Sequence, residues 1–157
     1  MYVDNNNLLA GSISSTTGAL TAQTALGTDT SVLSTNAVDL SIARDMGEGQ
    51  NLYARFSCLT AASGGTSVEF QVIASDAANG TGNVQVVGTT GAILVASVIA
   101  NSRFAALINP RLASKGQRYL TGRFVFVGAV AAGAYTADLG IDVADGQKFY
   151  ANGFAVL

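Results

Sequence analysis

The chain contains no histidine or tryptophan, and only one cysteine and one proline among its 157 residues. Histidine is the side chain best suited to proton transfer near neutral pH, and histidine and cysteine dominate zinc sites. Serine and threonine are abundant, but a hydroxyl without a neighbouring base is a weak nucleophile. The lone Cys58 excludes a disulfide within one chain. We therefore expect a structural or binding protein that is not an enzyme and needs no cofactor.

Charged side chains are also scarce, at 11% of the residues, against about 25% in an average soluble domain. Hydrophobic residues make up 49% of the chain. An isolated monomer of this composition would expose much weakly polar surface, so we expect copies of the chain or a partner to cover part of it. A net charge of −2 gives no reason to expect nucleic acid as a partner.

No uninterrupted apolar run is long enough to cross a membrane as a helix, because the longest candidate, residues 92–100, is too short. The first residues show neither the basic start nor the apolar stretch of a signal peptide. These features predict a soluble protein made in the cytoplasm, without a membrane as a partner.

Alternating apolar and polar side chains predict β-strands along most of the chain. In residues 52–58 every second side chain is apolar, which places Phe56 and Cys58 on the buried face of a strand. Further strands are predicted at residues 37–42, 68–72, 83–86, 92–99, 103–108, 119–127 and 135–143. About eight short antiparallel strands, separated by glycine-rich turns, predict a single all-β domain, a jelly roll or β-sandwich.

Two segments fall outside this pattern. Residues 10–31 are rich in glycine, serine, threonine and alanine and poor in bulky side chains, so we expect residues 1–31 to form an extended N-terminal arm and loop. Residues 144–157 are expected to form a C-terminal tail or a last edge strand.

Charged residues give three candidate constellations. Asp138, Asp142 and Asp145 could gather around Ca²⁺, although carboxylates on the polar face of a strand are usually solvated, and we expect no metal. Arg44 and Asp45 precede two glycines in a segment that forms either a contact loop or simply a tight turn. Five basic residues lie in a segment without acidic residues and form either a contact to an acidic partner surface or a scattered solvated face. They are Arg103, Arg111, Lys115, Arg118 and Arg123.

Several stretches resemble a known family. Residues 34–40 read Ser-Thr-Asn-Ala-Val-Asp-Leu, and residues 43–49 read Ala-Arg-Asp-Met-Gly-Glu-Gly, followed by Leu52 and Tyr53. Together they resemble the N-terminal signature of capsid cement proteins of short-tailed phages, of the type first described for a Bordetella phage. The opening residues and residues 118–120 and 133–137 are similar to that family too.

The resemblance implies a jelly-roll protein of the virion exterior that binds a shell of major capsid protein and bridges its subunits. It also implies a symmetric homo-oligomer, a dimer or a trimer. The N-terminal arm and the aromatic tail are the expected contact elements. Their contact residues are Tyr2, Val3, Leu8, Leu9, Phe149, Tyr150 and Phe154.

A carbohydrate- or receptor-binding module of a phage or bacterial surface is the alternative, because it uses the same architecture. Sugar sites generally need exposed aromatic platforms, and 8% aromatic residues without tryptophan argue against this alternative.

Overall fold

A computed structural model gives the fold and describes residues 5–41, 51–109 and 116–141. Strands dominate these residues, and the two helices are single 3-10 turns. None of the helices in this part of the chain is long and apolar enough to span a membrane. In chain order the elements are η1 (Asn5–Asn7), β1 (Leu8–Ala10), β2 (Ser12–Ile13), β3 (Leu20–Thr21), β4 (Gln23–Thr24), β5 (Gly27–Thr28), β6 (Ser31–Asp39), β7 (Tyr53–Gly64), β8 (Ser67–Ser75), β9 (Gln85–Leu94), η2 (Val95–Ser97), β10 (Arg103–Leu107), β11 (Tyr119–Val127) and β12 (Ala129–Gly140).

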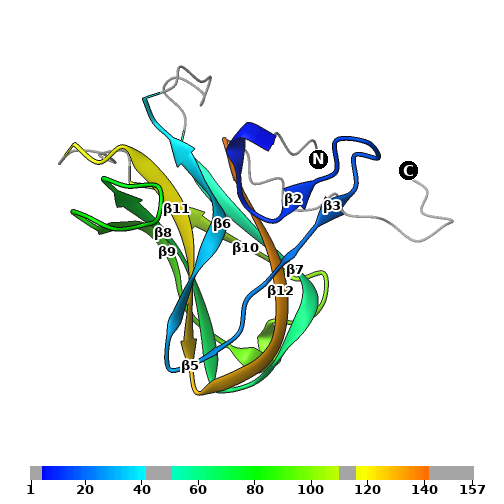
Figure 1. The fold of residues 1–157 in the computed structure, drawn as a ribbon. Coiled ribbons are helices and arrows are strands. Elements are labelled where there is room, and N and C mark those ends of the chain that lie inside the picture. The colour runs from blue at the N-terminus through cyan, green and yellow to red at the C-terminus, as the bar shows by residue number, and fades with distance from the viewer. Residues whose placement is uncertain (1–4, 42–50, 110–115, 142–157) are drawn as a thin grey trace, which may run out of the picture.

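Ten of these strands form two antiparallel sheets, of six and four strands, that face each other (Figure 1). The first sheet has the order β1-β12-β7-β10, with β4 and β5 also paired to β12, and the second has the order β6-β11-β8-β9. The eight main strands are β1 and β6 to β12. Numbered one to eight along the chain, they run 1-8-3-6 in the first sheet and 2-7-4-5 in the second. This is the strand order of a jelly roll. The prediction of an all-β jelly roll with about eight strands is confirmed.

The core between the two sheets is built around aromatic rings. Phe56, Phe70, Phe124 and Tyr135 are all fully buried. The ring centroid of Phe70 lies 5.1 Å from that of Phe56, 5.9 Å from that of Phe124 and 5.3 Å from that of Tyr135. Cys58 belongs to the same core, as expected, and burial raises the pKa of its thiol. The contacts among these rings thereby hold the two sheets together.

The turns β7–β8 and β11–β12 lie against each other at one end of the sandwich, at the bottom of Figure 1. Gly65 in the first turn and Gly128 in the second have φ angles of +69° and +77°, a backbone conformation that residues other than glycine rarely adopt. A Cβ atom on Gly128 would lie 2.9 Å from the Cα atom of Gly65. Glycine is therefore required at position 128 for both conformation and space.

One predicted strand is wrong over half of its length. The apolar run 92–99 was expected to be a single strand, but β9 ends at Leu94 and η2 follows. The Val95 N–H donates to the Thr66 carbonyl, and the Val98 N–H then donates to the Val95 carbonyl, which turns the fully buried Val98 into the core. Because a short apolar run suits a buried strand and a buried turn equally, the pattern could not separate them.

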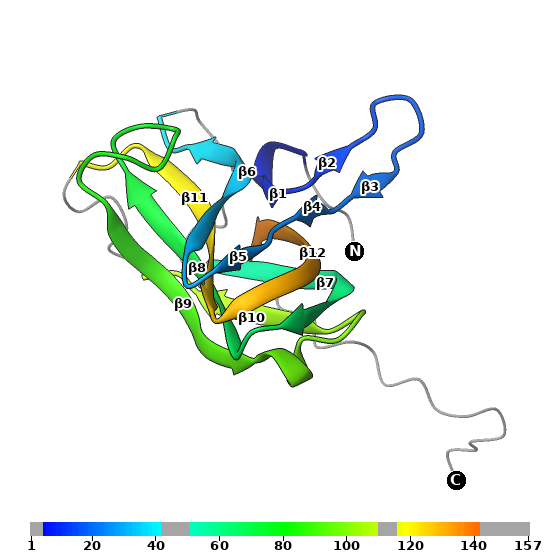
Figure 2. The same cartoon turned by 60° about the horizontal axis from the view of Figure 1, so that its bottom comes forward.

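The expected N-terminal arm is correct only in part. The hairpin of β2 and β3 projects beyond the sandwich (Figure 2), and most of its residues are exposed. In contrast, Leu8, Leu9 and Ala10 are buried with at most 2% of their surface exposed, as is Ala25. These residues pack into the domain itself, because β1 pairs with β12 and also contacts β6. The expected tail, 144–157, lies outside the described residues.

The N-terminal segment also forms hydrogen bonds with the edge of β6. The Gln23 Nε2 atom donates to the Leu33 carbonyl oxygen at 2.8 Å, and the Thr35 N–H donates to Gln23 Oε1 at 2.8 Å. The Asn36 Nδ2 atom donates to the Gly11 carbonyl oxygen at 2.9 Å. Two backbone groups on this edge of the second sheet, the Leu33 carbonyl and the Thr35 N–H, are therefore satisfied within the chain.

Candidate interaction surface

The two N-terminal leucines are not a contact surface. Leu8 and Leu9 were expected to bind a partner, but they are 2% and 0% exposed. Leu9 approaches the middle of β11, where a Cβ atom on Gly122 would lie 3.7 Å from the Leu9 Cβ atom. The expectation is corrected for these two residues: they stabilise the fold. Tyr2 and Val3 lie outside the described residues.

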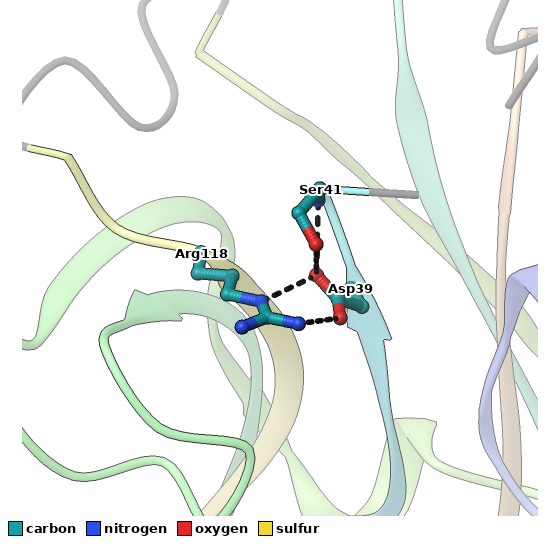
Figure 3. Close-up of polar contacts among 3 residues, drawn as sticks. All are labelled: Asp39, Ser41 and Arg118. Carbon is teal, nitrogen blue, oxygen red and sulfur yellow. Dashed lines mark hydrogen bonds and ion pairs between the residues drawn. The ribbon is translucent and has the colours of Figure 1, made fainter. Parts of the chain in front are cut away.

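Arg118 is held by an acidic neighbour on the adjacent strand (Figure 3). Its Nε atom donates to Asp39 Oδ1 at 2.9 Å and its Nη2 atom donates to Asp39 Oδ2 at 2.7 Å. The Ser41 N–H and hydroxyl both donate to Oδ1, at 2.9 and 2.8 Å. The Arg118 guanidinium and these donors hold the pKa of Asp39 far below its usual range. The Arg118 Cζ atom also lies over the Tyr119 ring, 5.1 Å from its centroid.

Arg123 belongs to a polar network on the outer face of the second sheet. Its Nε atom donates to Gln71 Oε1 at 2.8 Å, and Gln71 Nε2 donates to Glu69 Oε1 at 2.7 Å. The Thr89 hydroxyl donates to the same Glu69 oxygen at 2.6 Å. The network crosses β11, β8 and β9 in register, since Arg123 pairs with Gln71 and Gln71 pairs with Thr89. Arg123 is thus hydrogen-bonded to a neighbouring strand of its own sheet.

Arg103 lies on the other sheet. It is exposed on β10, opposite Ser57 of β7. Arg103, Arg118 and Arg123 therefore occupy separate places, and two of them are engaged within the chain. The structure does not bring these three together as one basic patch. Arg111 and Lys115, the other members of the predicted set, lie outside the described residues.

Asp138 is not solvated. It is 5% exposed and forms an ion pair with Arg55 on the neighbouring strand β7. Burial raises the pKa of Asp138, although the hydrogen bond from Arg55 opposes that shift. No group of three or more His, Cys, Asp or Glu side chains suited to a metal occurs in 5–41, 51–109 or 116–141. Asp142 and Asp145 fall outside these ranges, as do Arg44, Asp45, Phe149, Tyr150 and Phe154.

The structure reveals an apolar row that the sequence reasoning missed. Val127 of β11, Ser67 of β8 and Leu94 of β9 are cross-strand neighbours on the outer face of the second sheet. Ser67 in the middle is buried, so the exposed members of this row are the two apolar side chains. Val127 is 49% exposed, and Leu94, at 64%, is the most exposed large hydrophobic side chain that the structure describes. One sequence signal pointed here, because residues 77–102 contain no charged side chain. An apolar row beside an uncharged edge is a candidate binding surface.

A comparison with protein families gives one match. The family model described as Bbp16, a family of Bordetella phage proteins, matches residues 15–139. The match runs from the β2–β3 hairpin almost to the end of β12, and so includes all of the second sheet and most of the first. No curated protein matches the chain significantly.

Proposed function

We propose that this chain, which belongs to the Bbp16 family of Bordetella phage proteins, is a structural protein of the virion. It binds the outside of the capsid and bridges neighbouring subunits of the major capsid protein. It acts through its surfaces and not through a catalytic site. The observation that carries the proposal is the family match over residues 15–139, which spans most of the jelly roll.

The physical character of the domain supports this role. A protein that ties shell subunits together has to resist being pulled apart, and the interlocked aromatic core joins both sheets to one another. Bridging is served by several interfaces of modest size that act together, each on the order of 1,200–2,000 Å². A surface poor in charge suits such contacts, because few ions lose water when it is covered.

The exposed surface offers different features on different sides. The second sheet presents the apolar row of Val127, Ser67 and Leu94 next to the polar network around Glu69. The first sheet presents Arg103 on β10, and the β2–β3 hairpin projects from the sandwich (Figure 2). A bridging subunit needs at least two separate binding surfaces, and we infer that they lie among these features.

The proposal is tested with shells assembled from the major capsid protein encoded by the same phage genome. Purified protein is added to the shells, unbound protein is removed by sedimentation, and the shells are heated. We expect saturable binding at a fixed ratio to the capsid protein, and disruption of the shells at a higher temperature than without the protein.

Two results would overturn the proposal. One is absence of binding to intact shells at protein concentrations of about 10 μM, well above what a virion component with many contacts needs. The other is saturable binding of the isolated protein to defined glycans on an array, together with no effect on the shells. That second result would favour the carbohydrate-binding alternative.

A further inference from the structure

The strand β9 ends the second sheet, and part of its outer edge is open. It pairs with β8 on one side only (Figure 2). Near its start, the Asn109 N–H donates to the Val87 carbonyl oxygen at 2.7 Å and covers the edge there. At the other end, residues 92–94 have no strand beside them among the residues that the structure describes. The opposite edge of the same sheet, β6, is covered by Gln23.

The register of β9 shows which backbone groups face outward. Leu94 pairs with Ser67, and the next residue, Val95, donates its N–H to the Thr66 carbonyl. Leu94 and Ser67 therefore form a non-hydrogen-bonded pair, in which N–H and C=O groups point away from the partner strand. The same direction holds for Ala92, two residues earlier. Ala92 and Leu94 thus present two N–H and two C=O groups at the edge.

This stretch lacks two of the features that normally keep sheet edges apart, charged residues and proline. Natural edge strands are protected by charged residues, by proline or by bulges. A bulge at Thr90–Gly91 interrupts the ladder before Ala92, and η2 follows after Leu94. Between them, the three residues 92–94 carry no charge and no proline. A short, regular and uncharged edge remains, and it ends with the exposed side chain of Leu94.

We propose that β9 of a second copy of this chain pairs antiparallel with residues 92–94. A twofold axis beside Ile93 places Ala92 of each copy opposite Leu94 of the other. Each of these two residue pairs exchanges two main-chain hydrogen bonds, and the two four-stranded sheets become one continuous sheet. An interface of this kind brings each residue close to its own counterpart, so a charged edge would repel itself. The uncharged edge of β9 fits a second copy for this reason.

The pairing goes beyond the proposed binding to a capsid. A dimer built in this way doubles the number of shell contacts that one particle can make, which suits a bridging protein. It forms in solution, however, so it can be tested without shells. Failure to dimerise and failure to bind shells are separate results.

The test compares two substitutions at one position. Leu94→Ala removes the apolar side chain and keeps the N–H. Leu94→Pro removes both, and the φ angle of −59° at Leu94 already suits proline. Because the Leu94 N–H points away from β8, proline there leaves the β8–β9 ladder intact. Leu107→Ala, at a side chain 51% exposed on β10, is the control for loss of apolar surface elsewhere.

Sedimentation velocity over a range of concentrations gives the mass and the dissociation constant. We expect the native protein to reach twice 15.9 kDa. Relative to Leu94→Ala, the Leu94→Pro variant should dissociate about 30-fold more readily, because each dimer loses two hydrogen bonds. Leu107→Ala should match the native protein. In the native dimer, the backbone amides of Ala92 and Leu94 should exchange hydrogen with solvent more slowly than in the dilute monomer, because pairing hydrogen-bonds both of them. This measurement tests the pairing without any substitution.

A native protein that stays at 15.9 kDa at about 200 μM overturns the pairing, because a virion dimer has to form at lower concentrations. Equal dissociation of Leu94→Ala and Leu94→Pro also overturns it, as does fast exchange of both amides in the dimer. If the native protein is monomeric and Leu94→Pro weakens binding to shells, then the edge receives a strand of the capsid protein and not a second copy.

Discussion

Arg55 on β7 and Asp138 on β12 form an ion pair on the outer face of the first sheet, 83 residues apart in the sequence. The Asp138 side chain is 7% exposed and that of Arg55 is 20% exposed. The guanidinium also extends over Gly140, where a Cβ atom would lie 2.8 Å from Arg55 Cζ. The pair joins two central strands where solvent screening is weak.

Removing one member of this pair should strongly destabilise the protein. Asp138→Ala leaves the Arg55 guanidinium largely buried without its carboxylate, which costs about 3 kcal/mol. The double substitution Arg55→Met with Asp138→Leu replaces the pair by apolar side chains and should recover most of that loss. Urea unfolding measures both free energies. A double variant as unstable as Asp138→Ala would show that the ion pair itself stabilises the fold.

The two aspartates that pair with arginine should respond to pH in opposite directions. Burial raises the pKa of Asp138 above 3.8, so the folded state takes up its proton first and the stability contributed by this carboxyl grows as the pH falls through that pKa. Arg118 lowers the pKa of Asp39, so the stability contributed by Asp39 is fully present above about pH 5 and is lost on further acidification.

Unfolding of Asp138→Asn and Asp39→Asn between pH 7 and pH 3 tests these signs. The difference in unfolding free energy between native protein and Asp138→Asn should widen as the pH falls from 7 toward 4. The difference between native protein and Asp39→Asn should narrow below about pH 5. Differences that stay constant over this range would contradict both assignments.

The strand pattern was predictable because alternation is a local property of the sequence. The run 119–127 was predicted from its period of two, and β11 has the same bounds, Tyr119–Val127. The rule failed for β1, because all three of its residues are buried and do not alternate. β1 pairs with β12 and also contacts β6 of the facing sheet, so it has no solvent side. A short strand covered on both faces carries no alternation to read.

The side-chain partners could not be predicted in the same way. Asp138 was expected on a solvated face, and Arg118 in a basic segment, yet each has a partner about eighty residues away. Such pairs depend on which strands become neighbours and in which register, and a one-residue shift would turn every side chain to the other face. The apolar row of Val127, Ser67 and Leu94 likewise exists only after β11, β8 and β9 have paired.

Phe70 should be the costliest core residue to truncate. Its ring contacts those of Phe56, Phe104, Phe124 and Tyr135, with centroid distances of 5.1 to 5.9 Å. Phe70→Ala should cost about 4 kcal/mol, because the rigid rings around it cannot close the cavity. Phe104→Ala, at a partly exposed ring stacked on Phe70, is the control and should cost about half as much. Equal losses in thermal unfolding would contradict this ranking.

Gly128 should tolerate alanine much less well than Gly116. Both have positive φ angles, +77° and +82°. A Cβ atom on Gly116 meets nothing within 4 Å, whereas on Gly128 it meets the backbone of Gly65 at 2.9 Å. Gly116→Ala should therefore cost about 1 kcal/mol for the backbone conformation alone, and Gly128→Ala about 2 kcal/mol more. Similar losses in urea unfolding would show that the two turns move apart easily.

Leu9 tests whether the N-terminal segment belongs to the domain. Its side chain is fully buried, so Leu9→Ala should lower the free energy of unfolding by about 3 kcal/mol. Leu20→Ala changes the same side chain in the projecting hairpin, where Leu20 is 36% exposed, and should cost less than about 0.5 kcal/mol. A free arm would instead make both substitutions harmless to folding, and Leu9→Ala would then weaken only the binding of a partner. Urea unfolding of the two variants, followed by binding of each to shells, separates a core residue from a contact residue.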